Sequence, residues 1–264
     1  MGKDEILKFI HSSYPLSNGV YQLTEPPEST FEAAYLEIRS KEGRLLTNDQ
    51  IKRLPGVSVG HPHYSEWQIR ARSAMLLREY LSHHQQKVLL ELGCGNGWLT
   101  NYLAQTSTLI LGVDINRSEL ETAARLFEMP IFGYGNIMSV DLQMPPMFDA
   151  VVVASAFQYF SDTLSLFECL LRFVKPGGEI HIVDTPIYAT KERAEAASRR
   201  TMAYYRQLGV NIPSHYFHHS WEDLEGINYN VLYKPTSFPT NILRKLKMES
   251  RPFPWIMVKK AGNS

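Results

Sequence analysis

The sequence predicts an α/β protein with a mostly parallel central sheet, and three observations support this fold class. Five short apolar runs of strand length recur between residues 88 and 184. Amphipathic stretches of helical length separate most of them, at residues 99–105, 118–127 and 161–174. A glycine-rich turn follows the first apolar run, where a helix is expected to begin. Alternating strands and helices of this kind are typical of βαβ units, which build parallel sheets.

The expected strands are defined by their apolar content and length. They are residues 88–92, 109–113, 130–134, 149–154 and 179–184. A longer helix, rich in alanine and arginine, is expected at residues 190–208. Two more strand-like runs, at residues 228–233 and 254–259, have no clear helix between them. They are expected to form an antiparallel pair at an edge of the sheet.

The first 86 residues show a different pattern, in which helical segments alternate with polar, proline-containing breaks. One helix is expected at residues 31–40. Thr47 with Gln50, and Ser65 with Gln68, have the spacing of capping boxes that open two further helices. We interpret residues 1–86 as a helical N-terminal extension and cofactor-covering arm. Residues 87–264 then form the main domain, with a lid inserted at residues 186–226.

The charge balance disfavours one class of partner. Lys plus Arg and Asp plus Glu are 27 each, so the formal net charge is zero. Proteins that bind long nucleic acids normally carry a basic surplus, because neutralising phosphates drives that binding. Nucleic acid is therefore an unfavoured partner.

The cysteines and the N-terminus indicate a cytoplasmic protein. Cys94 and Cys169 are too few for a disulfide framework, and no cysteine or histidine cluster has zinc spacing. No metal is expected. The N-terminus lacks the apolar core of a signal peptide, and no run reaches the ~18 apolar residues of a membrane span. No membrane partner is expected.

The segment Glu91-Leu92-Gly93-Cys94-Gly95-Asn96-Gly97 lies where the first predicted strand ends and a helix begins. Glycines at alternate positions allow a sharp turn and let a ligand approach the backbone without meeting a Cβ. The helix start offers free N–H groups to an anionic group. The alternative is a tight turn that binds nothing.

Asp114 ends the second predicted strand, 21 positions after Gly93. An acid there can reach both hydroxyls of an adenosine ribose, because the ligand lies across the carboxyl ends of adjacent strands. The alternative is that Asp114 or Asn116 only caps the next helix. Dinucleotide-binding domains also have a glycine turn and an acid, but with G-x-G-x-x-G spacing. Here the spacing is G-x-G-x-G, and the acidic Glu91 suits a positive sulfonium better than a pyrophosphate.

These motifs resemble those of a known family. ELGCGNG followed by GVDIN is similar to motifs I and II of class I S-adenosylmethionine-dependent methyltransferases. Residues 135–137 resemble the position that contacts adenine, 148–155 resemble motif IV, and 171–178 resemble the turn into strand five. The resemblance covers about residues 87–185 and indicates a small-molecule branch of the family.

The resemblance implies a Rossmann-like fold, with a seven-stranded, mostly parallel sheet whose last strand is antiparallel. It implies S-adenosyl-L-methionine as cofactor and methyl transfer to oxygen or nitrogen of a small-molecule acceptor. Asn136 replaces the commoner Asp but can still hydrogen-bond an adenine. The implied cofactor-binding residues are Glu91, Gly93, Cys94, Gly95, Gly97, Asp114, Ile115, Asn136, Ile137 and Ser155, with Tyr64 and Arg70 from the arm.

Two acceptor chemistries are disfavoured. Residues 154–159 read ASAFQY, without the N/D-P-P-Y/F motif of N6-adenine enzymes. Neither cysteine is placed for cytosine C5 chemistry. The segment DTPIY at residues 184–188 faintly resembles the amine motif, but it follows strand five and is interpreted as a strand exit.

The candidate catalytic residues are His215, His218, His219 and Tyr159. The histidines lie in the predicted lid and could deprotonate a hydroxyl. The alternative for each is a structural or surface position. The arm around residues 55–70 and the segment 186–226 are both rich in His and aromatic residues, so we expect them to wall the acceptor pocket.

Other function classes remain open at this point. One is a non-catalytic S-adenosylmethionine-binding subunit or sensor that recognises a protein partner. Others are RNA or protein methylation, which needs a basic face beside the methyl group, and a nicotinamide oxidoreductase. The sequence determines neither the acceptor nor the oligomeric state.

Overall fold

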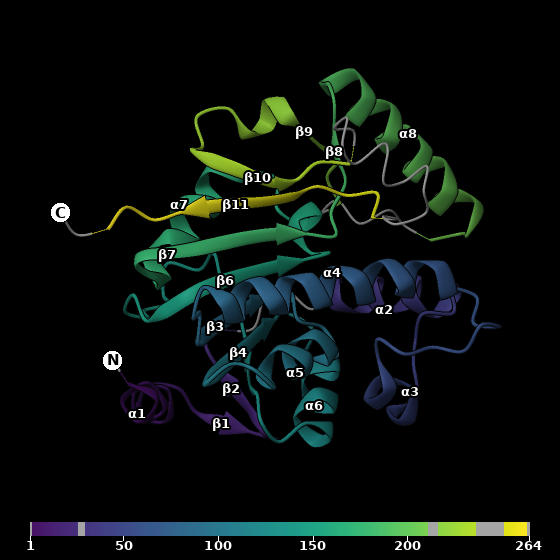
Figure 1. Ribbon diagram of the computed structural model, residues 1–264. Coiled ribbons are helices and arrows are strands. Elements are labelled where there is room, and N and C mark those ends of the chain that lie inside the picture. The colour runs from purple at the N-terminus through teal and green to yellow at the C-terminus, as the bar shows by residue number, and fades with distance from the viewer. Residues whose placement is uncertain (1, 26–29, 211–215, 236–250, 263–264) are drawn as a thin grey trace.

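The computed structural model describes residues 2–25, 30–210, 216–235 and 251–262, and within them nine strands form one central sheet (Figure 1). Its strands are β1 (Leu16–Ser17), β2 (Val20–Gln22), β3 (Val88–Leu92), β4 (Leu109–Asp114), β5 (Ile131–Tyr134), β6 (Phe148–Ala154), β7 (Val174–Val183), β10 (Tyr229–Tyr233) and β11 (Trp255–Lys259). Their spatial order is β1-β2-β5-β4-β3-β6-β7-β11-β10. A two-stranded parallel sheet pairs β8 (Ile187–Tyr188) with β9 (His219–Ser220).

Helices of the described residues fill the connections between strands. They are α1 (Lys3–Ser13), α2 (Thr30–Lys41), α3 (Asn48–Arg53), α4 (Tyr64–His83), α5 (Trp98–Ala104), α6 (Arg117–Leu126), α7 (Thr163–Phe173) and α8 (Lys191–Gln207), with 3-10 turns η1 (Phe157–Tyr159) and η2 (Trp221–Leu224). Asn116 and Asp162 start α6 and α7, because each side chain accepts a hydrogen bond from a backbone N–H three residues on.

The predicted seven-stranded sheet is confirmed in β3 to β7, β10 and β11. β3 pairs parallel with β4 and β6, and β7 pairs parallel with β6. β11 is antiparallel to both of its neighbours, β7 and β10. The two C-terminal runs therefore form the expected antiparallel pair, and β10 is the edge strand.

The N-terminal extension is not purely helical, which corrects the prediction for residues 1–86. β2 pairs parallel with β5, and β1 pairs antiparallel with β2, so this segment extends the sheet beyond seven strands. Val20 and Tyr21 are buried against residues more than a hundred positions later. A run of three residues has no recognisable period, so only this long-range pairing makes it a strand.

The two proposed capping boxes have different outcomes. The Thr47–Gln50 box is formed at the start of α3. The Ser65–Gln68 box is wrong, because α4 already begins at Tyr64 with His63 before it. Ser65 is thus inside the helix.

The core has two layers because alternate strand residues point to opposite faces. One apolar cluster joins α4 and α5 to the sheet, and it includes Leu77, Leu81, Leu103, Leu89 and Val152. Another joins α1 and α7 to the opposite face, and it includes Ile10, Leu166, Leu170, Leu90 and Val151. The sheet is therefore covered on both sides, as a parallel sheet requires.

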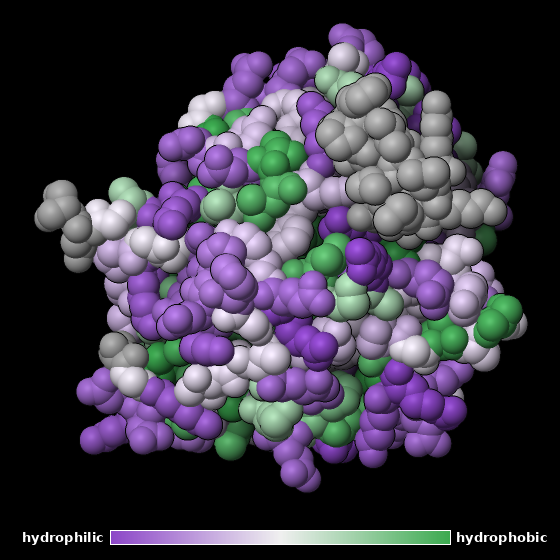
Figure 2. Space-filling model, viewed as in Figure 1, coloured by the Kyte–Doolittle hydropathy of each residue, from purple (hydrophilic) through white to green (hydrophobic). Residues whose placement is uncertain are grey.

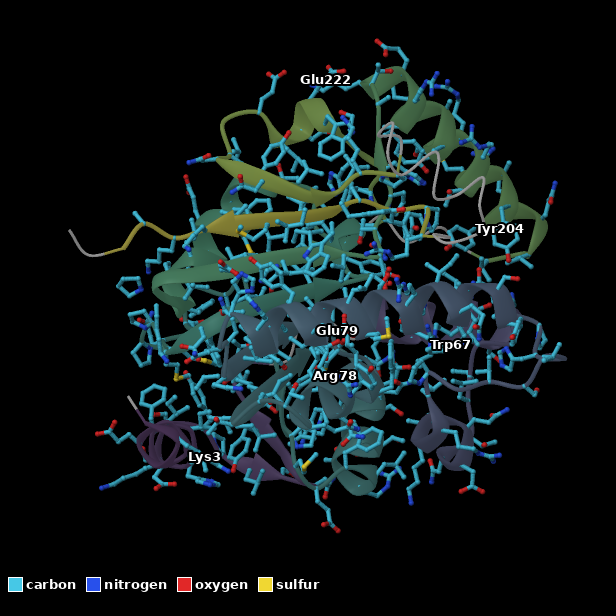
Figure 3. The ribbon with its side chains drawn as sticks, in the orientation of Figure 1. Lys3, Trp67, Arg78, Glu79, Tyr204 and Glu222 are labelled. Carbon is cyan, nitrogen blue, oxygen red and sulfur yellow. The ribbon has the colours of Figure 1, made fainter. Side chains whose placement is uncertain are left out.

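Hydrophilic residues cover most of the face shown in Figure 2. Within the described residues, no helix combines the length and the apolar content that crossing a membrane needs. Trp67, near the start of α4, and Tyr204, near the end of α8, lie at the same end of the molecule (Figure 3). The carboxyl ends of β6 and β7 point towards that end (Figure 1), and β3 runs parallel to β6.

Candidate functional site

The glycine loop after β3 depends on backbone conformations that favour glycine. Gly93, Gly95 and Gly97 have φ of 74°, 51° and 73°. A Cβ on Gly93 would stand 2.4 Å from the Cβ of Ala156, and one on Gly97 would stand 2.8 Å from the Phe132 ring. A Cβ on Gly95 would meet only the Glu119 side chain, at 3.1 Å. Packing thus requires the outer two glycines, whereas at Gly95 the side chain of Glu119 would have to shift, and Gly95 lines the cavity described below.

Asp114 ties the end of β4 to this loop. The Gly95 N–H donates to Oδ2 at 2.7 Å, and the Asn116 N–H donates to Oδ1 at 2.8 Å. Burial raises the pKa of Asp114, while the backbone donors oppose that rise. Asn116 also caps α6 through a bond from the Glu119 N–H at 3.0 Å. Asn116 therefore caps α6, whereas Asp114 contacts the glycine loop.

Glu91 is a buried carboxyl group inside β3, 2% exposed. Thr100 Oγ1 donates to its Oε2 at 2.6 Å. Burial raises the pKa of Glu91 to about 8, opposed by the Thr100 hydrogen bond and assisted by Asp114. A positively charged ligand beside the loop would favour the ionised form.

A cavity of about 560 Å³ opens in front of the glycine loop. Its walls come from the loop, the ends of β6 and β7, helix α2, residues 61–70, and the α8 region. This volume falls within the range of small-ligand sites, about 300–1,000 Å³. The described residues contain no group of three or more His, Cys, Asp or Glu that could hold a metal ion.

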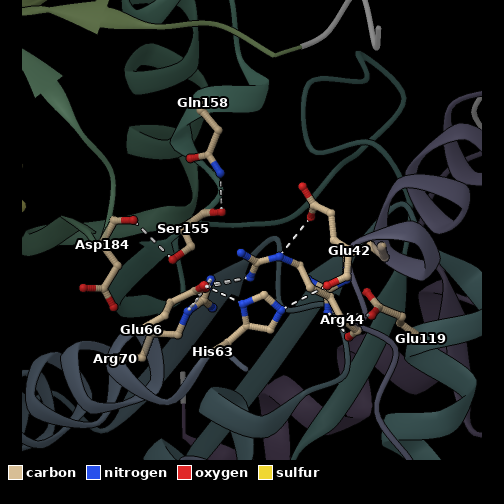
Figure 4. Close-up of polar contacts among 10 residues, drawn as sticks. Glu42, Arg44, His63, Glu66, Arg70, Glu119, Ser155, Gln158 and Asp184 are labelled. Atoms are coloured by element: carbon tan, nitrogen blue, oxygen red, sulfur yellow. Dashed lines mark hydrogen bonds and ion pairs between the residues drawn. The ribbon is translucent and has the colours of Figure 1, made fainter. Parts of the chain in front are cut away.

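An ion-pair network crosses one side of the cavity (Figure 4). Arg44 contacts Glu42 at 2.9 Å and Glu66 at 2.8 Å, and Arg70 contacts Glu66 at 2.9 Å. Burial alone would raise the pKa of Glu66, but the Arg70 and Arg44 guanidiniums outweigh it and lower the pKa. His63 Nε2 donates to the Glu42 carbonyl at 3.1 Å. The network ties α4 to the segment that follows α2.

The opposite side is formed by the residues that follow β6 and β7. Ser155 and Asp184 both have φ of 53°, an uncommon conformation for residues other than glycine. Ser155 Oγ donates to the Asp184 carbonyl at 3.2 Å, and Ser73 Oγ donates to Asp184 Oδ1 at 2.6 Å. Gln158 Nε2 donates to the Ser155 carbonyl at 2.6 Å. Two strained strand ends are thus held together at the cavity (Figure 4).

Tyrosine side chains complete the lining. The Tyr35 and Tyr159 rings are 6.2 Å apart and meet at 78°, and the Tyr159 and Tyr216 rings are 5.7 Å apart at 89°. Tyr205 from α8 also borders the cavity. Burial raises the pKa of Tyr159 well above its ordinary value, so its hydroxyl is neutral at physiological pH.

The predicted cofactor residues divide into two groups. Those that line the cavity are Glu91, Gly93, Cys94, Gly95, Ser155 and Arg70. Those outside its lining are Gly97, Asp114, Ile115, Asn136, Ile137 and Tyr64. Asn136 is exposed, its N–H donates to Thr24 Oγ1 at 3.1 Å, and Ile137 is a buried core residue.

The structure describes two of the three predicted base histidines, and it brings neither of them to the cavity. His219 is buried, with its ring 4.8 Å from that of Phe157. His218 Nε2 contacts Thr201 Oγ1 at 3.0 Å. Neither lines the cavity. The prediction for His215 falls outside the described residues.

Sequence reasoning missed several lining residues, above all Tyr35, Arg39, Glu119 and Asp184. The segment of Tyr35 and Arg39 is the expected helix, and their i, i+4 spacing puts them on one face. This spacing could have indicated that Tyr35 and Arg39 share one helix face, but it does not indicate what that face packs against. For Asp184, the signal was an acid at the end of a predicted strand.

Comparisons with known proteins agree with this geometry. Residues 90–182 match a family model described as a methyltransferase domain. The ubiquinone biosynthesis O-methyltransferase of Pseudomonas paraeruginosa is 30% identical over 101 residues, which cover 36% of this chain and 43% of the relative. The same enzyme of Pseudomonas fluorescens is 31% identical over 98 residues, covering 36% and 42%. The chain thus aligns with less than half of these relatives.

Solved structures share the fold at low identity. The YcgJ protein from Bacillus subtilis has a TM-score of 0.54 at 16% identity, covering 73% of this chain and 100% of that one. Magnesium protoporphyrin IX methyltransferase from Synechocystis, solved with S-adenosylhomocysteine, has a TM-score of 0.53 at 11% identity, covering 88% and 100%. The fold is Rossmann-like, of the methyltransferase type. The match over residues 90–182 and the shared fold support the predicted family, the class I S-adenosylmethionine-dependent methyltransferases.

Proposed function

We propose that this protein transfers a methyl group from S-adenosylmethionine to an oxygen or nitrogen of a small-molecule acceptor. One observation carries the proposal. The cavity at the glycine loop continues past Gly93 and Gly95 to the ends of β6 and β7 and to the tyrosines. It therefore offers a donor site and an adjoining acceptor site in one space, and proximity is the main contribution to methyl transfer.

On the donor side, the residues present fit the methyl donor. Gly95 lines the cavity, Asp114 lies beside the loop, and a bound sulfonium would favour the ionised form of Glu91. We propose that the donor is held by Glu91, Gly93, Cys94, Gly95, Gly97, Asp114, Ile115, Asn136, Ile137 and Ser155, with Tyr64 and Arg70 from the arm. The bound donor supplies the electrophilic methyl carbon.

We propose that the N-terminal arm and the segment 186–226 close over the acceptor. Their contacts support this role. Ile38 of α2 packs with Tyr205 and Val210, and Lys41 Nζ donates to the Gly209 carbonyl at 3.1 Å. In this proposal residues 1–86 are the covering arm, 87–264 the main domain and 186–226 its lid.

The named relatives support a small-molecule acceptor, since one is a ubiquinone biosynthesis O-methyltransferase. A non-catalytic binding subunit gains no support from the site, because the cavity extends beyond the donor loop. Exclusion of nucleic acid as a partner and a cytoplasmic location stay predictions.

The test uses a donor whose methyl group carries deuterium. The protein is incubated with this donor and with panels of phenols, catechols, alcohols and amines, and products are analysed by mass spectrometry. We expect one labelled methyl group on a member of the panel and stoichiometric S-adenosylhomocysteine. Donor binding without transfer to any acceptor in these panels or in bacterial metabolite extracts would contradict the proposal.

A further inference from the structure

The carboxylates around the cavity differ in their partners. Besides Glu91 in β3, four carboxylates of the described residues line it. Three have arginine partners: Glu42 with Arg44, Glu66 with Arg44 and Arg70, and Glu119 with Arg39. The partner of Asp184 is instead the neutral hydroxyl of Ser73, at 2.6 Å. Asp184 therefore keeps its charge available for a ligand.

The position of Asp184 is fixed from two directions. It follows β7 directly, and its carbonyl accepts from Ser155 Oγ, which follows the adjacent strand β6. Its side chain is held by Ser73 from α4, more than a hundred residues away in sequence. Both strand-end residues have positive φ, and strain of this kind concentrates at functional sites.

The other candidate bases are less well placed. Histidines 218 and 219 do not line the cavity. Because burial raises the pKa of Tyr159 well above its ordinary value, its hydroxyl can donate a hydrogen bond but cannot take a proton at physiological pH. His63 does line the cavity, but its Nε2 is bonded to the Glu42 carbonyl and its Nδ1 is 4.0 Å from Glu66, within the arginine network.

We propose that Asp184 takes the proton of the acceptor, which binds with its hydroxyl or protonated amine at this carboxylate. The inference rests on the proposed methyl transfer and deepens it. The acceptor atom forms a bond to the methyl carbon while the carbon–sulfur bond breaks, and that electron pair stays on sulfur. The acceptor's proton passes to an Asp184 oxygen and then to solvent.

The polar and charged side chains that act on Asp184 come from two elements. α4 contributes Ser73, Arg70 and Glu66, and the segment before β11 contributes Arg251. Burial raises the pKa of Asp184 to about 6; the Ser73 hydrogen bond, Arg70 and Arg251 oppose the rise, and Glu66 adds to it. Asp184 is thus mostly ionised at neutral pH and close in pKa to the working range of a general base.

The test compares two donor analogues, so it needs no knowledge of the acceptor. S-adenosylhomocysteine has an uncharged sulfur, and sinefungin carries an ammonium group where the donor has its methyl group. A carboxylate at the acceptor position should favour sinefungin. We expect the ratio of the two dissociation constants, measured by calorimetry, to change about tenfold or more against sinefungin in Asp184→Asn, as loss of a charge-assisted bond implies.

The matched control is Glu42→Gln, which changes another carboxylate of the same cavity that pairs with Arg44, and it should leave the ratio unchanged. An unchanged ratio in Asp184→Asn overturns the inference. So does an equal loss of both analogues, which would place Asp184 at the amino-acid end of the donor. If the wild-type protein binds neither analogue, the proposed function itself fails.

A second measurement uses pH. The preference for sinefungin should rise between pH 5 and pH 8 more in the wild-type protein than in Asp184→Asn, because Asp184 is protonated below about pH 6. Burial raises the pKa of Glu91 to about 8 and that of Glu119 to about 7 in both proteins, so the difference between the two proteins reports Asp184. Equal changes in the two proteins contradict the proposed role.

Discussion

The donor and acceptor halves of the cavity are built in different ways. The donor half consists of short contiguous segments at the ends of β3 and β4, joined by the Gly95–Asp114 hydrogen bond. The proposed acceptor half combines α2, the end of β7 and the α8 region. Local sequence therefore specifies the first, whereas only tertiary packing assembles the second. This difference predicts that donor binding and acceptor recognition can be changed separately.

The largest expected effect is on the donor half. Gly95→Val should reduce S-adenosylhomocysteine affinity at least 100-fold, because the branched side chain would occupy the ligand's space. Gly177→Val is the matched control, since Gly177 also has positive φ but meets nothing within 4 Å. Calorimetry gives the affinity, and circular dichroism checks the fold. Equal affinity in the two variants would exclude Gly95 from the donor site.

Buried carboxyl groups predict a second effect, on stability without ligand. In the folded state burial raises the pKa of Glu91 to about 8, so the protonated form is favoured there. The associated stability is present below the unfolded pKa, near 4.5, and is lost as pH rises through 8. Glu91→Gln should weaken this pH dependence and stabilise the protein at pH 9 by on the order of 3 kcal/mol.

Burial also raises the pKa of Glu119 to about 7 and that of Asp184 to about 6. The Glu91→Gln variant should therefore retain part of the pH dependence of stability. Denaturant unfolding at pH 5 and pH 9 measures both effects. Stability that rises with pH between these values in the wild-type protein would contradict the burial of ionisable carboxyl groups.

Asp114→Ala should weaken donor binding by about one to two powers of ten, through loss of charge-assisted bonds to ribose hydroxyls. It also removes the bond to the Gly95 N–H, so Asp114→Asn is a useful companion that retains an acceptor for this bond. Titration with S-adenosylhomocysteine is the measurement. Wild-type affinity in a folded Asp114→Ala protein would remove this residue from the site.

The smallest effect on donor binding is expected from the acceptor half. Tyr159→Phe should change donor affinity by less than about threefold, because the Tyr159 ring, which the variant keeps, packs edge-on against the rings of Tyr35 and Tyr216. Its effect should instead appear in the Michaelis constant for the acceptor. A large loss of donor affinity would show that the two halves are not separable.

The sequence allowed the prediction of the central sheet, because β3, β4 and β6 are mainly apolar and the second half of β7 is a short run of strand length. It also located the glycine loop and Asp114, whose positions depend on neighbouring strand ends. It did not predict β1 and β2. These are strands only because β2 pairs with β5 and β1 pairs with β2. Local patterns contain no information about such distant partners.

The acceptor side shows the same limit in individual residues. Tyr35 and Arg39 lie in an expected helix, but the cavity that they border is formed with residues far along the chain. Asp184 was interpreted as a strand exit, because local sequence does not reveal its hydrogen bond from Ser73 of α4. His218 and His219 were predicted to be catalytic because they lie next to each other in the sequence. In the structure His218 contacts Thr201, and His219 packs against Phe157.

The central claim is that the glycine-loop cavity binds the methyl donor, and one titration tests it most directly. Wild-type protein is titrated with S-adenosylhomocysteine in a calorimeter, and then with NADH as the competing ligand class. We expect saturable binding of one S-adenosylhomocysteine per chain, which S-adenosylmethionine displaces, and no binding of NADH. Binding of NADH without binding of S-adenosylhomocysteine would contradict it.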